Sequence, residues 1–428
     1  MSTLLLLLPC VLVVDAEFAK ALLGGESAWQ RLTEDTLPPE QKIEAFADLA
    51  DRLARMVPRR LLKESVTGTF PPQRGEVVRL EGRIVSVIRY DGKVPVYRCR
   101  LVLDSEKYPP TFLSSFLSQR REGHEEEQKT LCSSCLYECL CERPSVEVYI
   151  FTPAIPQAWK QNMPVQERAA AFGLFLQSHN GTPIFAAPAI EWYPDTWLGH
   201  LGFNVASFDQ VPVSRVTELA QHDEETNRLL FKFTEADAEP FYGLLRAVSA
   251  TPEGWLEGEA KKQQAEAPIS VADLFNRPAE TRGKPVLLRG TAKRIVPTPV
   301  ADSAVHSLFG IDHYYQVFLF TKEAQGNPIV VCVRSLPEGM PIGDADDFSE
   351  EITVAAVPYK LWIYETPPKP HYAPLLAGRS LTWHPKASAH SSGNRQAPEG
   401  FSTFSFAAFC VLVIIWMACR FWARRCFR

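Results

Sequence analysis

The chain has 428 residues, of which 46% are hydrophobic and 22% are charged, and its formal net charge is −5. This length and composition are sufficient for two ordinary hydrophobic cores. The acidic balance argues against a nucleic-acid-binding protein, because such proteins gain much of their affinity by neutralising phosphates.

The first 16 residues are predicted to be a secretory leader. An apolar run from Leu4 to Val14 is too short to span a bilayer, and Val14 and Ala16 stand at the −3 and −1 positions of a cleavage site. A lipoprotein site at Cys10 and a buried first strand are alternatives. Residues 17–70 form a predicted helical segment, with apolar residues at helical spacing between Thr33 and Met56.

An internal duplication organises most of the remaining chain. The segment Arg74–Gly82 reads R-G-x-x-V-x-L-x-G, and the same pattern recurs 208 residues later at Arg282–Gly290. Each copy opens a run that alternates apolar and polar residues, which is typical of a strand. The glycine that ends each motif suits a bulge or a sharp bend.

Further strands are predicted in the same order in both copies. The first copy has them at 96–103, 146–151, 172–177 and 187–194, and the second at 314–320, 329–333, 360–364 and 373–385. Five strands with a long, bent first strand predict a small barrel of the OB type. An open antiparallel sheet or a sandwich is the alternative. A helix is predicted before each barrel, the second from Thr234 to Ala250 with a capping-box start.

The predicted fold class is therefore mainly β with α: two OB-like modules, each preceded by a helix, and one C-terminal transmembrane helix. The first barrel is assigned to 71–195, a helical linker to 196–268 and the second barrel to 269–385.

An insertion at 105–145 distinguishes the first barrel from the second. It contains four cysteines, Cys132, Cys135, Cys139 and Cys141. Thiolates are good ligands for soft metal ions, but only three residues separate the two pairs, which is cramped for a tetrahedral zinc site. Local disulfides and a variable insertion are the alternatives. Cys99 and Cys332 fall within strands and are expected to be small buried residues.

The C-terminal residues predict a membrane anchor. A flexible stalk at 386–400 precedes an apolar stretch at 401–419, and a tail at 420–428 contains four arginines and no acid. Basic residues directly after a span mark the cytoplasmic side, so both barrels are expected outside an inner (cytoplasmic) membrane. Removing the four tail arginines from the net charge of −5 leaves −9 on the rest of the chain.

Few residues suggest a binding site, and no catalytic motif is present. His313 and Tyr315 could belong to a ligand face, although a hydrogen-bonded structural histidine is the simpler interpretation. Trp192 and Trp383 recur at matching strand ends, either as an aromatic platform for sugars or as residues that close a barrel. No phosphate-binding loop, zinc-protease or serine-hydrolase motif occurs. The sequence therefore predicts no enzyme and no cofactor.

Several segments of the second copy resemble a known family. Ser270–Asn276, Arg282–Gly290, Gly310–Tyr315, Leu336–Pro341 and Tyr359–Trp362 together look like a family of uncharacterised single-span membrane proteins from planctomycete-type bacteria. The segment Ala355–Pro358 departs from that pattern. The resemblance implies two OB-like repeats and transfers no catalytic residue.

Three functional hypotheses follow. The leading one is a membrane-anchored extracytoplasmic binding or scaffold protein with a protein or saccharide partner at the envelope. The second is an envelope metal or redox module that uses the four clustered cysteines. The third is an oligonucleotide-binding OB protein, which the negative charge disfavours.

Overall fold

The computed structural model of the chain describes residues 13–34, 39–57, 59–67, 72–104, 106–108, 146–161, 166–213, 231–366 and 369–385. All described residues belong to one compact unit, which ends at Pro385. Within the described ranges, no helix is both long and apolar enough to cross a bilayer. The predicted stalk, span and tail lie outside these ranges and stay predictions.

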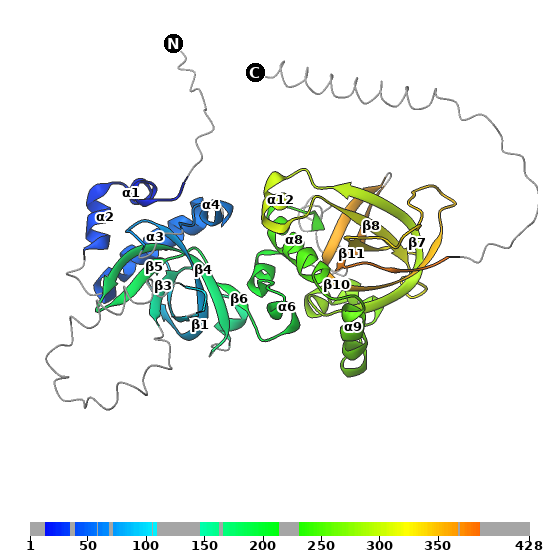
Figure 1. Cartoon of the computed structure of the whole chain (residues 1–428), viewed down its shortest axis with the longest axis horizontal. Helices are drawn as coiled ribbons and strands as arrows, with labels where there is room; N and C mark the ends of the chain where they lie inside the picture. The colour runs from blue at the N-terminus through cyan, green and yellow to red at the C-terminus, as the bar shows by residue number, and fades with distance from the viewer. Residues whose placement is uncertain are drawn as a thin grey trace, which may run out of the picture. The chain divides into compact units, whose positions relative to one another are not determined.

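The first module is a six-stranded sheet with helices on one side (Figure 1). Its strands are β1 (Val77–Tyr90), β2 (Val96–Leu103), β3 (Glu147–Thr152), β4 (Arg168–His179), β5 (Thr182–Ala186) and β6 (Glu191–Tyr193). Its helical elements are α1 (Ala16–Leu23), α2 (Glu26–Thr33), η1 (Pro39–Lys42), α3 (Ile43–Met56), α4 (Arg59–Glu64) and η2 (Gln157–Lys160).

The second module repeats this arrangement. Its strands are β7 (Val286–Pro299), β8 (His313–Phe320), β9 (Ile329–Val333), β10 (Glu350–Thr366), β11 (Lys369–Gly378) and β12 (Thr382–His384). The helical elements around it are α6 (Trp197–His200), η3 (Val205–Gln210), α8 (Glu235–Ser249), α9 (Trp255–Glu266), α10 (Val271–Asn276), α11 (Pro278–Thr281) and α12 (Ser303–Phe309). Two similar six-stranded modules confirm the predicted duplication.

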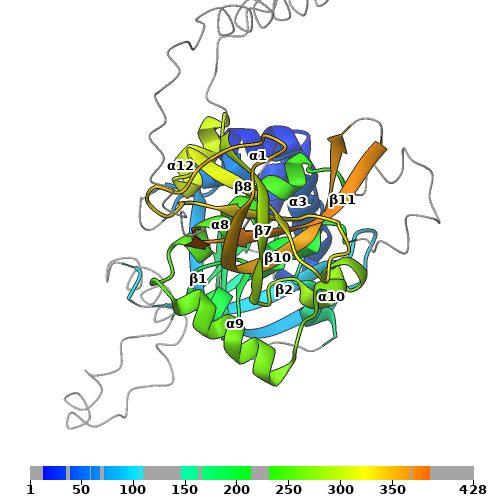
Figure 2. The same cartoon turned by 90° about the vertical axis from the view of Figure 1, so that its right-hand side faces the viewer.

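Five strands of each module form a closed circuit. Because β1 pairs with β2 and also with β4, the order returns to its start as β1-β2-β3-β5-β4-β1. The second module closes in the same way as β7-β8-β9-β11-β10-β7. Within each module, the third and fifth strands in chain order are parallel to each other (β3 with β5, and β9 with β11). The other paired strands are antiparallel. Figure 2 shows the strands of the second module wound around a common interior.

The repeated glycines explain the bend of the first strand. A Cβ at Gly82 would lie 2.0 Å from the carbonyl oxygen of Val102, and one at Gly290 would lie 2.3 Å from that of Phe320. Only glycine allows the neighbouring strand to approach so closely. A register shift follows two residues later in both strands, at Ile84/Ser86 and Ala292/Arg294. The glycine of each motif is thus a point of close strand approach, and the bulge lies just beyond it rather than at the glycine itself.

Apolar residues of the motif fill the two barrel interiors. Val78 and Leu80 are buried in the first, and Val286 and Leu288 are buried at the equivalent positions of the second, as predicted. The outer faces of the strands carry a second apolar layer that the helices cover. Burial on both faces accounts for continuous apolar runs such as Ile329–Val333.

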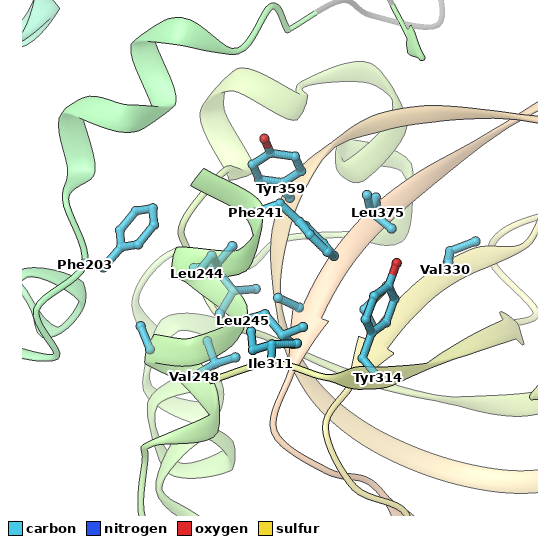
Figure 3. Close-up of a cluster of buried hydrophobic side chains, with 14 of the residues drawn as sticks. Phe203, Phe241, Leu244, Leu245, Val248, Ile311, Tyr314, Val330, Tyr359 and Leu375 are labelled. Carbon is cyan, nitrogen blue, oxygen red and sulfur yellow. The ribbon is translucent and has the colours of Figure 1, made fainter. Parts of the chain in front are cut away.

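Helix α8 packs on the outer face of β9 and β11. Phe241 lies 5.9 Å from Tyr314, measured between ring centroids, and both belong to a buried cluster with Leu244 and Val330 (Figure 3). The capping box predicted at Thr234 and Asp237 is present at the start of this helix. Helix α3 has the corresponding position in the first module, where Phe46 lies 4.7 Å from Phe151 of β3.

Three sets of predicted boundaries differ from the structure. The predicted fifth strands at 187–194 and 373–385 are not single strands: the first range contains only β6 and follows β5, and the second spans the end of β11 and all of β12. The helix predicted over Thr33–Met56 is divided: α2 ends at Thr33, Pro39 begins a 3-10 helix, and α3 begins at Ile43. Proline lacks the N–H that a continuous helix needs. The fourth strands are longer than predicted, because the first half of each pairs with the first strand and the second half with the fifth.

Residues at the predicted leader boundary belong to the folded structure. Val14 is buried, and its backbone N–H donates to Ser65 Oγ at 2.8 Å. The side chain of Asp15 caps α1 by accepting from the backbone N–H of Phe18 at 2.9 Å. Ala16 lies against Gly75, where a Cβ would be 2.3 Å from the Ala16 Cα. Cleavage after Ala16 would remove all three contacts.

We therefore expect any leader cleavage to occur before Val14, so that the mature chain keeps the Asp15 cap. Loss of such an N-terminal helix cap lowers the free energy of unfolding by about 1 kcal/mol. Loss of Val14 would in addition remove a buried apolar side chain. Mass spectrometry of the protein purified from its native source measures the mature N-terminus. A mature chain that begins at Glu17 would contradict this expectation.

Candidate functional site

A polar cavity of about 430 Å³ lies on the outer side of the first module. Its size is within the usual range for small-molecule sites. The lining residues come from β1, the end of β2 and the segment after it, the start of β4 and the residue Gln166 before it, the end of β6, and the segment after α6: Arg79, Glu81, Gly82, Arg83, Val102, Leu103, Asp104, Lys107, Gln166, Arg168, Ala169, Tyr193 and Gly202.

Strand alternation places the charged residues in this cavity. Val78 and Leu80 point into the barrel, so Arg79, Glu81 and Arg83 stand on the opposite face of β1. Arg168 is the first residue of β4, and its neighbour Ala169 belongs to the interior cluster. The pairing of β1 with β4 brings the outward residues of the two strands to the same cavity.

Positive charge exceeds negative charge in the lining. Glu81 pairs with two cations: its carboxylate lies 2.5 Å from Arg79 Nε and also contacts Lys107. Desolvation first, and then the positive charges of Arg168 and Arg79, lower the pKa of Lys107. Arg79 also lies 3.6 Å from Glu191 and over the ring of Phe172.

Two exposed arginines occupy directly paired strand positions, and neither forms an ion pair among the described residues. Arg83 and Arg168 are direct partners in the pairing of β1 with β4. Arg83 donates to the backbone oxygen of Gln166 at 2.8 Å, and among the described residues Arg168 forms no ion pair. Like charges directly opposite each other on neighbouring strands are destabilising. This arrangement favours an anion between the two guanidinium groups.

The second module has different residues at the two strand positions that correspond to Arg83 and Arg168. There the equivalent strand partners are Thr291 and Glu351, and the Thr291 hydroxyl donates to Glu351 at 2.6 Å. The equivalent of Arg79 is Leu287, at the same distance from the repeated motif. The duplication thus supplies an internal comparison. At the same paired strand positions, the second module has a hydrogen-bonded pair, Thr291 and Glu351, whereas the first module has two arginines.

The beginning of the insertion contributes to the cavity. The Tyr108 hydroxyl accepts from the backbone N–H of Glu81 at 2.5 Å and donates to the oxygen of Arg79 at 3.2 Å. Burial raises the pKa of Tyr108. Lys107 and Tyr108 are therefore part of the first module, although sequence comparison with the second copy assigns them to a dispensable insertion.

The two predicted residues on β8 lie together. His313 and Tyr315 have ring centroids 5.7 Å apart, and His313 Nδ1 lies 2.9 Å from the Asp312 carboxylate. Backbone N–H groups of Asp312 and His313, with the imidazole, lower the pKa of Asp312 to about 2. Arg334 contacts the same carboxylate at 3.4 Å. The polar groups of this cluster bond to one another. The cluster lies in the second module, and none of its residues lines the cationic cavity.

The two predicted tryptophans have matching structural contacts. The Trp192 indole N–H donates to Glu167, and the Trp383 indole N–H donates to Glu350 at 2.7 Å. Both are half-buried, and each fixes a short last strand to the beginning of the fourth strand of its module. They belong to different modules and form no common platform with His313 and Tyr315.

The four clustered cysteines, at 132, 135, 139 and 141, lie outside the described residues. Within the described ranges, no group of three or more His, Cys, Asp or Glu residues could hold a metal ion. Cys99 and Cys332 are buried free thiols, as predicted. Burial raises the pKa of Cys99 to about 12, which makes it a structural rather than a reactive thiol.

Sequence reasoning missed the cationic cavity. Its available signal was Arg79, Glu81 and Arg83 at alternate positions of a strand whose second copy carries Leu287, Arg289 and Thr291. The second arginine of the opposed pair, Arg168, is 85 residues further along the chain. Only the pairing of β1 with β4 brings the two together.

Comparisons with known proteins assign no family. No family model matches the chain, and no curated protein matches it. A solved structure described as "Structural mimicry for functional antagonism" is 6% identical, with a TM-score of 0.14, and the match covers 72% of this chain and 92% of that one. At this TM-score the likeness carries no argument about fold or function.

Proposed function

We propose that the chain is a membrane-anchored, extracytoplasmic binding protein whose first module holds an anionic group of its ligand. The strand circuit 1-2-3-5-4-1, with parallel third and fifth strands, supports an OB-type barrel for each module. OB-type barrels bind oligonucleotides and oligosaccharides. The anchor at 401–419 and the resemblance to single-span membrane proteins are part of this proposal.

The opposed pair Arg83 and Arg168 is the observation that carries the proposal. Like charges on directly paired strand positions are unfavourable, and an anion bound by both exposed arginines would offset that repulsion. Each guanidinium can present two parallel N–H donors to a carboxylate, sulfate or phosphate. Lys107 and Arg79 add further positive charge to the same cavity.

The modules have different roles in this proposal. In the second module the equivalents of the paired arginines, Thr291 and Glu351, are hydrogen-bonded to each other. The second module then acts as a structural support, and the first module carries the binding site.

Equilibrium dialysis of the full-length protein in nonionic detergent against labelled sulfate tests the proposal. We expect the parent to bind sulfate and Arg168→Glu, which introduces the residue of the second module, to lose at least about tenfold in affinity, since hydrogen bonds to charged groups contribute about 1.5–3 kcal/mol. Arg168→Glu should also melt slightly higher, because it replaces a repulsive pair by an attractive one.

Lys322→Glu is the matched control, because it makes the same charge reversal at an exposed position of the second module. It should leave sulfate binding unchanged. Equal binding by the parent and by Arg168→Glu would refute an anion site at the opposed arginines.

A further inference from the structure

A second cavity, of about 470 Å³, adjoins the cationic cavity. Arg79, Tyr193 and Gly202 line both, so the two hollows form one continuous space. The remaining lining of the second cavity comes from α4, β6, α8, α12, η3 and the segment between α6 and η3. A ligand whose anionic group lies at the paired arginines therefore has room to continue into the second cavity.

The amide of Asn204 has an unused hydrogen-bond donor at the second cavity. Asn204 lines this cavity, and its Nδ2 is buried without a hydrogen-bond partner among the described residues. The side-chain oxygen accepts from the backbone N–H of Trp192 at 2.9 Å, so exchanging the oxygen and nitrogen of the amide would lose that bond. A buried donor without a partner is unfavourable. A ligand oxygen in the second cavity would satisfy it.

Strand pairing gives the distance between the arginines and Asn204. Arg83 of β1 pairs with Arg168 of β4, and Arg168 pairs with Tyr193 of β6. Asn204 is bonded to β6 at Trp192. Because neighbouring strands lie about 4.8 Å apart, an anion between the two arginines is roughly 10 Å from the Asn204 amide.

Part of the second cavity is apolar. Phe203, Leu308 and Phe309 line it, and Phe203 belongs to the buried cluster around α8 (Figure 3). Gly243 of α8 lies beside both phenylalanines: a Cβ there would be 3.6 Å from the ring of Phe203 and 3.7 Å from that of Phe309. An apolar side chain of a ligand can pack on these rings.

Another part of the lining is charged. Lys63 pairs with Glu239 at 2.6 Å, and Arg79 lies 3.6 Å from Glu191. Covering such pairs with hydrocarbon would remove their water without replacing its hydrogen bonds. The lining therefore suits a ligand that combines polar amide groups with apolar side chains, as a peptide does.

We propose that the ligand is a short peptide whose C-terminal carboxylate lies between Arg83 and Arg168 and whose backbone carbonyl, about three residues earlier, accepts from Asn204 Nδ2. An extended chain advances about 3.3–3.6 Å per residue, so about three residues span the roughly 10 Å between the two contacts. Apolar side chains of the peptide pack against Phe203 and Phe309. This inference rests on the proposed anion site, and it adds the class, direction and length of the ligand and a part in binding for α8 and α12.

Titration calorimetry of the full-length protein in nonionic detergent with N-acetylated peptides of alternating alanine and leucine, about one to five residues long, tests the inference. We expect affinity to increase by about fivefold or more between two and four residues, because the buried Asn204 donor then gains its acceptor. Asn204→Asp keeps the oxygen that accepts from Trp192 and replaces the donor by an acceptor. This variant should lose the increase with length and still bind sulfate. The same peptides amidated at the C-terminus, which lack the carboxylate, should bind at least about tenfold more weakly.

Gly243→Leu tests the apolar part of the cavity. Its Cβ would make ordinary van der Waals contacts, and the rest of the side chain would occupy the space beside Phe203 and Phe309. This variant should bind sulfate like the parent and lose the increase with peptide length. Asn276→Asp is the matched control for Asn204→Asp, because it makes the same change at an exposed position of α10, and it should behave like the parent.

Sulfate binding separates this inference from the anion site itself. If the parent binds sulfate but binds the shortest and longest peptides equally, or if either variant keeps the increase with length, a peptide ligand is refuted while the anion site stands. If the parent binds neither sulfate nor peptides, the anion site is refuted as well. Equal binding of amidated and free peptides would contradict the proposed direction. Tighter binding of linear galacturonic acid oligomers than of the peptides would refute the ligand class.

Discussion

Replacing Asp237 by alanine is expected to destabilise the second module by about 3–5 kcal/mol, because it leaves a buried ammonium group without its counter-charge. Lys360 Nζ lies 2.8 and 3.0 Å from the two carboxylate oxygens of Asp237, and the Tyr359 hydroxyl donates to the same carboxylate at 3.0 Å. Both charged side chains are almost fully buried, at 1% and 0% exposed. Desolvation lowers the pKa of Lys360, and the hydrogen bond and charge of Asp237 oppose that shift.

Urea unfolding of the full chain, followed by tryptophan fluorescence, measures this loss. Adding Lys360→Met to the Asp237→Ala variant should recover part of the stability, since replacing a buried ion pair by apolar groups is far less costly than breaking it. If the double variant is as unstable as the single one, the uncompensated charge is not the cause.

The first module provides a matched comparison at the same two positions. Lys42, at the start of α3, donates to Gln177 of β4 at 2.8 Å, and its ammonium also reaches the backbone oxygens of Leu32 and Glu34. Gln177 is neutral, and Lys42 keeps its carbonyl partners without it. We expect Gln177→Ala to cost about 1 kcal/mol, the usual value for one hydrogen bond, and so much less than Asp237→Ala.

Replacing Leu288 by aspartate is expected to cost about 4 kcal/mol or more, because it removes a buried apolar side chain and places an unpaired charge in a barrel interior. Leu288 is 6% exposed and belongs to the interior cluster together with Val354, its partner on β10. The same unfolding measurement gives the difference from the parent.

Leu287→Asp is the control, because this neighbouring residue on β7 points outward and is 37% exposed. A substitution there should change stability by no more than about 1 kcal/mol. Similar losses for the two variants would mean that the register of β7 is wrong.

Several features could be predicted from the sequence because they depend on local patterns. Alternation defined β2 at its observed bounds, and the repeated R-G-x-x-V-x-L-x-G motif placed Gly82 and Gly290 at the bend. The capping box at Thr234 was also readable, since its two partners are three residues apart. Each of these signals lies within one strand or one helical turn.

Other features were decided only by the tertiary structure. The opposed arginines Arg83 and Arg168 depend on the pairing of β1 with β4, and the buried pair Asp237 and Lys360 depends on how α8 packs on β10. The chain from Val14 to Ala16 reads as a cleavage site, but its contacts with Ser65 and Gly75 make it part of the first module. Local alternation decides which side of a strand a residue faces. Long-range strand pairing decides which charged residues meet on that side. The sequence around one residue of such a pair does not indicate where its partner lies in the chain.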